Sequence, residues 1–205
     1  PLLRVDGLSL SLSGLPVLHR VSFDLARGAC MALVGESGCG KTMTGLAIMG
    51  LVPGIRGKIE FHGQNLVEAD KAVLRSLRGG KMAMIFQEPL TSLSPVHTVG
   101  SQIAEAVALH QDVDREGARE RAIEMLEQVG IDMPRHRYSE YPHQFSGGMR
   151  QRAMIAMALS CAPKLLLADE PTTALDVTIQ RQILDLMLSL RDETGARVIL
   201  LTHDV

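Results

Sequence analysis

The run GESGCGKT at residues 35–42 has the residue types and spacing of a loop that binds phosphate. It fits the pattern Gly-x-x-x-x-Gly-Lys-Ser/Thr, in which glycines allow the backbone N–H groups to wrap around a phosphate. In this pattern Lys41 reaches the terminal phosphates and the Thr42 hydroxyl binds Mg²⁺. The residues predicted to bind the phosphates are Gly35, Glu36, Ser37, Gly38, Cys39, Gly40, Lys41 and Thr42.

Two adjacent carboxylates, Asp169 and Glu170, end the apolar run LLLADEP at 165–171. At the end of a buried parallel strand, both acids emerge at the carboxyl edge of the sheet, where such folds bind ligands. Asp169 is then placed to hold Mg²⁺, directly or through water, and Glu170 to orient or deprotonate an attacking water. An acid pair in this position is more often a solvated turn, and it is the phosphate loop that favours the catalytic interpretation.

Two further polar residues follow short apolar strands. Gln87 comes directly after Phe86 and can contact a Mg²⁺-bound water through its side-chain amide. His203 comes directly after Thr202 and can hydrogen-bond a γ-phosphate. Taken alone, Gln87 is more often a surface residue and His203 more often a strand cap, so only the ordered set is informative. The predicted catalytic residues are Glu170, His203 and Gln87, and the predicted metal ligands are Thr42, Gln87 and Asp169.

A second candidate anion site lies at Ser146-Gly147-Gly148, at the start of a run with few helix breakers. A serine followed by two glycines at a helix start leaves backbone N–H groups free, and these can bind an anion. Taken alone, the run predicts a helix start with modest anion affinity.

The predicted strands place the polar residues at strand ends. The run ACMALVG at 29–35 is continuously apolar, as expected of a strand that is buried on both faces. A helix is expected from Lys41 to about Leu51, where Pro53 and Gly54 stop it. The strands are expected within residues 3–13, 20–25, 29–35, 57–63, 81–86, 164–170 and 197–202.

The middle of the chain, from about Gly100 to Cys161, is predicted to be almost entirely helical. A later helix, from Val177 to Arg191, places four residues on one apolar stripe: Ile183, Leu184, Met187 and Leu190. Strands that alternate with helices indicate an α/β fold with a largely parallel sheet. We expect a core formed by residues 1–86 and 164–205, with a helical insertion at 87–163.

The composition is that of a soluble globular protein, with 46% hydrophobic and 21% charged residues and a net charge of −2. This near-neutral charge argues against a protein built mainly to grip nucleic acid. Three cysteines without a Cys-x-x-Cys pair indicate a reducing compartment, and neither a disulfide framework nor a structural zinc site. Because the chain stops directly after a predicted buried strand, we expect it to be part of a longer protein.

In this order and with these spacings, GESGCGKT, FQEP, FSGGM, LLLADEP, ALD and TH resemble the ATP-binding subunit of an ABC transporter. The resemblance covers essentially the whole chain, and its most specific part is the Ser-Gly-Gly signature shortly before the acid-ended strand. It implies a P-loop NTPase with a RecA-like parallel sheet, an N-terminal antiparallel β region and an α-helical signature subdomain hinged at Gln87. It also implies ATP and Mg²⁺ as cofactors.

The resemblance further implies a head-to-tail pair of such subunits. Ser146, Gly147 and Gly148 would then bind the γ-phosphate that the phosphate loop of the second subunit holds. Residues 174–176 match the family's D-loop, which adds Asp176 to the nucleotide-binding residues. Two departures stand out: Phe145 and Met149 replace the usual Leu and Gln of the signature, and Leu12 stands where many members stack adenine on an aromatic residue. Weaker binding of the base is therefore expected.

A finer resemblance, in the stretches 85–100 and 141–184, is to the ATPase subunits of importers for peptides and for nickel. It implies membrane permease subunits as partners, indirectly a substrate-binding protein, and a peripheral position on the cytoplasmic side of the inner membrane. The loop EPLTSLSP at 88–95 is expected to dock the permease. Peptide and nickel import remain alternatives, as does an ABC-type ATPase of DNA repair or translation.

Overall fold

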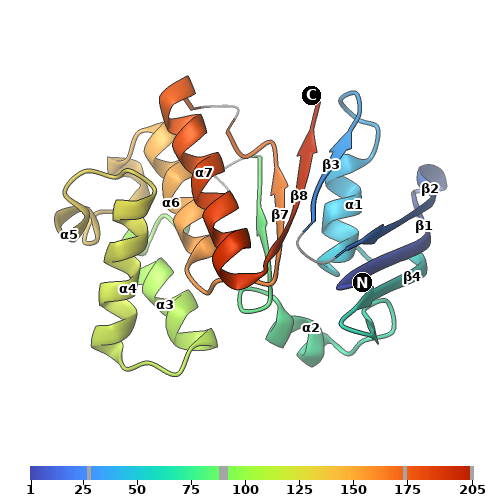
Figure 1. Cartoon of the computed structure of the whole chain (residues 1–205), viewed down its shortest axis with the longest axis horizontal. Helices are drawn as coiled ribbons and strands as arrows, with labels where there is room; N and C mark the ends of the chain where they lie inside the picture. Colours follow the sequence, from blue (N-terminus) through green and yellow to red (C-terminus); the bar gives the residue numbers. More distant parts are fainter. Residues whose placement is uncertain (27–28, 88–91, 173–174, 204–205) are drawn as a thin grey trace.

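The computed structural model describes residues 1–26, 29–87, 92–172 and 175–203. The described residues form two β-sheets, with helices on both sides of the second one (Figure 1). The first sheet is antiparallel and lies on one side of the molecule. The second sheet is parallel, lies at the centre, and positions the residues predicted to be functional.

The parallel sheet has the strand order β3-β8-β7-β6. All its pairings are parallel, so the carboxyl ends of its strands meet at one edge. In the third strand along this order, Leu165 and Leu167 enter one hydrophobic cluster, whereas Leu166 and Ala168 enter the cluster on the opposite face. Burial on both faces is the reason why its sequence is continuously apolar. The strands are β3 (Cys30–Val34), β6 (Met82–Ile85), β7 (Leu165–Asp169) and β8 (Arg197–Thr202).

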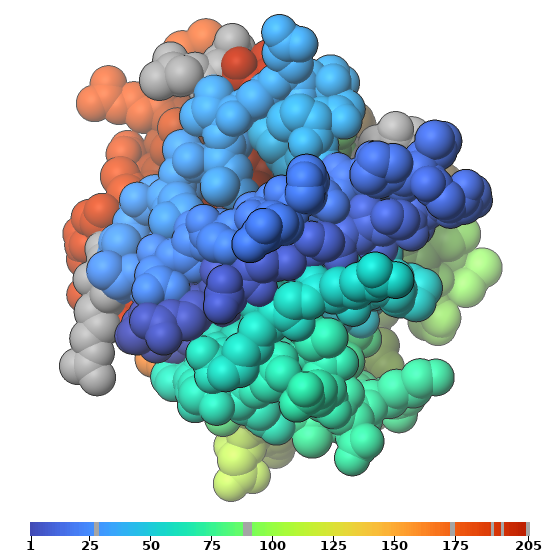
Figure 2. Space-filling model, turned by 90° about the vertical axis from the view of Figure 1, so that its right-hand side faces the viewer, coloured from blue at the N-terminus to red at the C-terminus, as the bar shows by residue number. Residues whose placement is uncertain are grey.

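The antiparallel sheet has the strand order β2-β1-β4-β5 and forms an outer layer. Figure 2 shows its first two strands as a dark blue band across this side of the molecule, with the teal residues that follow lying below them. The buried side chains of Leu8 and Ile59 pack in the same cluster as Leu167 of the parallel sheet, so the layer is attached through apolar contacts. The strands are β1 (Leu3–Leu12), β2 (Leu15–Leu25), β4 (Arg56–Phe61) and β5 (Gln64–Asn65).

Helices lie on both faces of the parallel sheet (Figure 1). The helix that follows the phosphate loop lies between the two sheets, and the larger helices lie on the opposite face. The helices are α1 (Lys41–Ile48), α2 (Lys71–Leu77), α3 (Val99–His110), α4 (Arg115–Gln128), α5 (Pro134–Arg137), a 3-10 turn at Pro142–Gln144, α6 (Gly147–Leu159) and α7 (Val177–Thr194). No helix among the described residues is long and apolar enough to cross a membrane.

Two local predictions are wrong. The first concerns β3, which is the end strand of the described parallel sheet and pairs with β8, so Cys30 is exposed and Val34 is 49% exposed. Its apolar sequence therefore does not reflect burial on both faces. The second concerns α7: Ile183 and Met187 are buried as expected, but Leu184 is 39% exposed because it lies beside the buried stripe.

The α/β fold class is confirmed, including the antiparallel N-terminal region and the parallel core. The segment between β6 and β7 is mostly helical, as predicted. Its buried residues, such as Ile103 of α3 and Ile155 of α6, share one hydrophobic cluster with Leu166 of the sheet. The boundaries of the helical insertion, at residues 87 and 163, stay a prediction.

The buried position of Leu166 leads to a stability prediction. Leu166 is 0% exposed in the central strand β7. We expect Leu166→Ala to lower the free energy of unfolding by about 2–5 kcal/mol, because it removes buried apolar atoms and leaves a cavity. Urea unfolding measures the change, with Leu15→Ala as the control because Leu15 is 71% exposed. Equal losses in the two variants would contradict the assigned core.

Candidate nucleotide-binding site

Each strand of the parallel sheet ends at a predicted functional residue or loop. The phosphate loop follows β3, His203 follows β8, Asp169 ends β7, and Gln87 follows β6. The phosphate loop lies above the carboxyl end of β3, at the edge to which the arrows of β7 and β8 point (Figure 1). Residues from four separate parts of the chain are therefore brought together by strand pairing.

The glycines of the phosphate loop are required by its backbone. Gly40 has a φ of 98° and precedes the first residue of α1, and Gly38 has a φ of 82°. A Cβ atom on Gly40 would lie 2.7 Å from the Leu18 side chain, and one on Gly35 would lie 2.5 Å from the Cys39 sulfur. The loop thus packs closely on β2 and on itself, and it leads directly into the first turn of α1, whose N-terminus can bind an anion.

The amine of Lys41 lies against the phosphate loop. Its Nζ donates hydrogen bonds to the backbone oxygens of Gly35 at 2.6 Å and Glu36 at 2.9 Å. The Cys39 sulfur lies 3.8 Å away from the same atom. These bonds fold the lysine side chain back over the loop, so the positive charge lies where the loop would bind a phosphate.

Thr42 and Asp169 form the next contact of the site. The Thr42 hydroxyl donates to Oδ2 of Asp169 at 2.6 Å, and Asp169 is only 2% exposed. Burial raises the pKa of the Asp169 carboxyl, and the charge of Glu170 adds to this, whereas the Thr42 hydrogen bond and Lys41 act in the opposite direction.

A hydroxyl and a carboxylate so close to a phosphate loop fit Mg²⁺. The ion prefers oxygen ligands and takes its remaining positions from phosphate oxygens and water. Within the described part of the chain, no group of three or more His, Cys, Asp and Glu side chains could hold a metal by itself. The donor set of Thr42 and Asp169 therefore suits an ion that arrives with a nucleotide.

Glu170 is the centre of the hydrogen-bonded group. Its Oε2 accepts from Nε2 of Gln87 at 3.1 Å, and its Oε1 lies 2.8 Å from Nδ1 of His203. The structure thus brings all three predicted catalytic side chains into one chain of contacts. The Glu170 backbone has a φ of 44° and its N–H donates to the Leu201 oxygen at 2.9 Å. For a residue other than glycine, this left-handed conformation costs about 1–2 kcal/mol.

A cavity of about 150 Å³ lies among these groups. Val17 of β2 lines it on the side of the antiparallel sheet, whereas Leu12 is 41% exposed at the tip of the β1–β2 hairpin and does not line it. The position that Leu12 would take toward a base therefore stays a prediction. The lining residues are Val17, Ser37, Gly38, Gly40, Lys41, Thr42, Met43, Gln87, Asp169 and Glu170.

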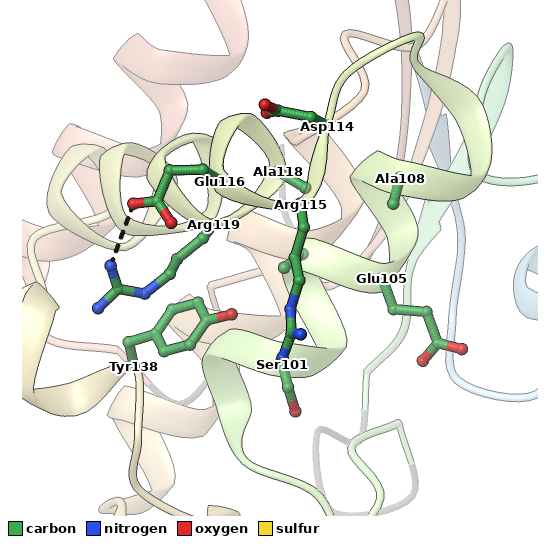
Figure 3. A pocket seen from close by; sticks show the side chains of 10 residues that line it. Ser101, Glu105, Ala108, Asp114, Arg115, Glu116, Ala118, Arg119 and Tyr138 are labelled. Atoms are coloured by element: carbon green, nitrogen blue, oxygen red, sulfur yellow. Dashed lines mark hydrogen bonds and ion pairs between the residues drawn. The ribbon is translucent and has the colours of Figure 1, made fainter.

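A larger hollow of about 790 Å³ lies elsewhere, between α3, the first turns of α4, and Tyr138. Figure 3 shows its lining, with the ion pair between Glu116 and Arg119 on one side. None of the predicted phosphate-binding or catalytic residues lines it. The smaller cavity at the carboxyl edge of the sheet is therefore the better candidate for the functional site.

The signature residues lie outside the 150 Å³ cavity. Ser146 caps α6, and its hydroxyl accepts from the N–H of Met149 at 3.2 Å. Ser146 and Gly147 are exposed, and a Cβ on Gly147 would meet nothing within 4 Å. The first turn of α6 is thus open toward the surface, as a site shared with a second molecule requires.

Parts of two predicted loops lie outside the described residues. For the D-loop this is Ala174, and for the docking loop it is the segment 88–91. Asp176 is described: its carboxylate caps α7 by accepting from the N–H of Ile179 at 3.0 Å. This contact is a helix cap of ordinary kind.

Two glutamines that bond the backbone of the segment directly after Glu170 were not identified from the sequence. The amide of Gln151 donates to the Pro171 oxygen at 2.5 Å, and that of Gln180 donates to the Thr172 oxygen at 3.0 Å. Gln151 stands one turn before Met154 and Ile155, on the apolar face of α6. A polar residue in such a stripe is a signal that could have pointed to it.

Taken together, the parallel sheet, the phosphate loop and the acid pair define a P-loop nucleotide-binding domain. A family model described as "ABC transporter" matches residues 18–173. The chain therefore belongs to the ABC transporter family.

Known proteins support this assignment. The chain is 55% identical, over 92% of its length, to the "Probable peptide ABC transporter ATP-binding protein y4tR" of Sinorhizobium fredii. It is 50% identical over its whole length to the "Dipeptide transport ATP-binding protein DppD" of Escherichia coli. It covers 58% of the first relative and 65% of the second.

Among solved structures, the chain is similar to the ATP-binding cassette MJ0796, described as a dimer in a post-hydrolysis state bound to ADP and Pi. The TM-score is 0.90 at 26% identity, and the match covers 98% of this chain and 88% of that one.

The burial of Asp169 predicts a pH-dependent stability. Because the folded chain holds the Asp169 proton to a higher pH than the unfolded chain does, the charged carboxylate costs stability as the pH rises above the ordinary aspartate pKa. Asp169→Asn should therefore melt higher than the wild type at pH 8 without nucleotide. Each kcal/mol corresponds to about 2–4 °C for a chain of this size.

The difference in melting temperature between Asp169→Asn and the wild type should shrink as the pH falls toward the ordinary pKa of an aspartic acid. Asp24→Asn is the control, because Arg4 lowers the pKa of the exposed Asp24 carboxyl and its removal should not raise the melting temperature. A constant difference at every pH would contradict the role of the buried charge.

Proposed function

We propose that this chain is the ATP-binding and ATP-hydrolysing part of an ABC importer, with peptides as the cargo. The observation that carries the proposal is the Glu170 carboxylate, which contacts both Gln87 and His203 beside a phosphate loop. A fixed carboxylate at this place suits the activation of a water molecule for phosphoryl transfer.

We assign a role to each part of the site from its geometry. The N–H groups of the loop at 35–42 and the amine of Lys41 bind the β- and γ-phosphates. Glu170 accepts a proton from the attacking water while the new P–O bond forms and the bond to ADP breaks. Gln87 and His203 hold the carboxylate in place, and His203 can also donate to the γ-phosphate.

Mg²⁺, when bound through Thr42 and Asp169, supplies positive charge that neutralises the phosphate oxygens. The Thr42 hydroxyl and the Asp169 carboxylate already lie within hydrogen-bond distance of one another. Gln87, the third predicted ligand, lines the same cavity and donates a hydrogen bond to Glu170.

A second subunit, identical or paralogous, would complete the site. The exposed first turn of α6 carries Ser146, Gly147 and Gly148 at the positive end of the helix. It would bind the γ-phosphate held by the second subunit, next to the D-loop with Asp176. Support comes from the similar cassette that is described as dimeric.

The names of the relatives support peptides as the cargo, because several of them are described as transporting dipeptides or oligopeptides. Import would require membrane permease subunits and a substrate-binding protein, with this chain peripheral on the cytoplasmic face of the inner membrane. Copurification with two permeases would support this assignment. Copurification with ribosomes or DNA would favour the alternative of a translation or DNA-repair ATPase.

Replacement of the proposed general base provides the first functional prediction. Glu170→Gln keeps the shape of the side chain but removes its basicity. We expect ATP binding to be retained while ATP turnover falls by about 10²–10⁴-fold. Turnover is followed by phosphate release and binding by a fluorescent ATP analogue, and undiminished turnover would refute the assignment.

A substitution at the signature provides the second functional prediction. Ser146→Arg places a large side chain at the exposed first turn of α6, away from the chain's own cavity. We expect the isolated chain to bind ATP as the wild type does, but ATP-dependent dimerisation, measured by light scattering, to be lost. Loss of ATP binding by the monomer would argue against a role across the dimer interface.

A further inference from the structure

We propose that Gln151 and Gln180 are positioning residues for Glu170, and that Gln151 links the signature end of α6 to it. This inference rests on the proposed ATP hydrolysis. It concerns the segment directly after the acid pair, where two helices contact consecutive backbone carbonyls.

The first contact comes from α6. Gln151 is 1% exposed, and its amide nitrogen donates to the Pro171 oxygen at 2.5 Å. Its amide oxygen is buried and has no hydrogen-bond partner among the described residues. An unpaired buried oxygen is unfavourable, so a side chain that only filled this space would be apolar. The hydrogen bond to Pro171 is the feature that accounts for a glutamine here.

The orientation of the amide follows from the same contact. If the amide were flipped, its oxygen would face the Pro171 oxygen, and two acceptors would repel one another. The donor must therefore point to Pro171. Gln151 acts on this carbonyl through a single hydrogen bond from a buried position.

The second contact comes from α7. The amide nitrogen of Gln180 donates to the Thr172 oxygen at 3.0 Å and to the Leu175 oxygen at 3.1 Å. The N–H of Leu175 also donates to the Thr172 oxygen at 3.0 Å. The carbonyls of residues 171 and 172 are therefore each held by a glutamine from a different helix.

Glu170 requires such support because of its backbone. Its φ of 44° is unfavourable for a residue with a Cβ atom and persists only where surrounding contacts impose it. Its N–H is bonded to Leu201 on one side. The two glutamines hold the chain on the other side at residues 171 and 172, so they set the backbone position from which the carboxylate reaches Gln87 and His203.

Gln151 also connects Glu170 to the signature. It lies on the same helix as the Ser146 cap, a little more than one turn further on. The first turn of α6 also lies near Leu175, because a Cβ added to Gly148 would be 3.6 Å from the Leu175 side chain. A shift of the first turn of α6 against a nucleotide of the second subunit would therefore move the backbone next to Glu170. The Glu170 of one subunit would thus respond when the signature of the same subunit binds the nucleotide held by the second subunit.

The test uses Gln151→Met in the full-length protein assembled with its partner subunits. Methionine keeps the length of the side chain but donates no hydrogen bond. We expect kcat for ATP hydrolysis to fall by about 10- to 100-fold, because the general base is misplaced. The KM and the dissociation constant of a fluorescent ATP analogue should change by no more than about twofold.

The matched control is Gln111→Met. The amide of Gln111 also donates to a backbone oxygen, that of Ser160, at 3.2 Å, but at the other end of α6. This variant should keep the kcat of the wild type. If Gln151→Met fails to fold, Gln180→Met tests the positioning of the same segment, because Gln180 is less buried and bonds the neighbouring Thr172 oxygen. This variant should lower kcat in the same way.

A double variant separates positioning from a general structural effect. In the Glu170→Gln background, Gln151→Met should cause no further loss of the residual turnover, because it acts through Glu170. A further loss equal to that in the wild type, or a parallel loss of ATP binding and thermal stability, would overturn the inference. So would full kcat in Gln151→Met, whereas a wild type without ATP hydrolysis would refute the proposed function itself.

Discussion

The site depends on the register of the parallel β-strands. Ala168 of β7 pairs with Ile85 of β6 and with Leu200 of β8, so the residues that follow on all three strands reach the same level of the sheet. That is how Gln87, Glu170 and His203 meet. A slip of one residue in any strand would turn its side chains to the opposite face. The apolar layers on both faces hold the register, because a slip would also bury the wrong side chains.

Several features of the site are unfavourable for folding, and the surrounding structure has to compensate for them. Asp169 is a buried carboxylate, Glu170 has a left-handed backbone, and the buried amide oxygen of Gln151 has no hydrogen-bond partner within the described part of the chain. All three lie within or against one short stretch at the end of β7. Such a concentration is typical of a catalytic site, where the geometry that chemistry needs is not the one that local preferences favour. The fully buried strand β7 and the largely buried strand β8 provide the rigid support.

The sequence predicted those parts of the site whose chemistry is local. The phosphate loop is recognisable because backbone, glycines and lysine lie within one short run. Gln87 and His203 are single polar residues, and only their order relative to the loop pointed to them. The bonds of Gln151 and Gln180 could not be predicted, because both depend on where two helices pass the segment after Glu170. The exposure of β3 is likewise set by strand order, which apolar content alone does not determine.

Helix α6 has two roles that constrain one another: its apolar face packs beside the sheet, and its first turn stays exposed. Its apolar face packs in the cluster beside the sheet, with Ala153 and Ile155 fully buried, and this packing fixes the helix as a rigid unit. Its first turn remains exposed at Ser146, where an anion can approach the helix N-terminus. A rigid helix cannot absorb a displacement at one end without passing it to its contacts along its length. Gln151 is a buried polar residue close to the signature on this helix, and it bonds the Pro171 oxygen. A displacement of the helix would therefore be passed to the backbone beside Glu170.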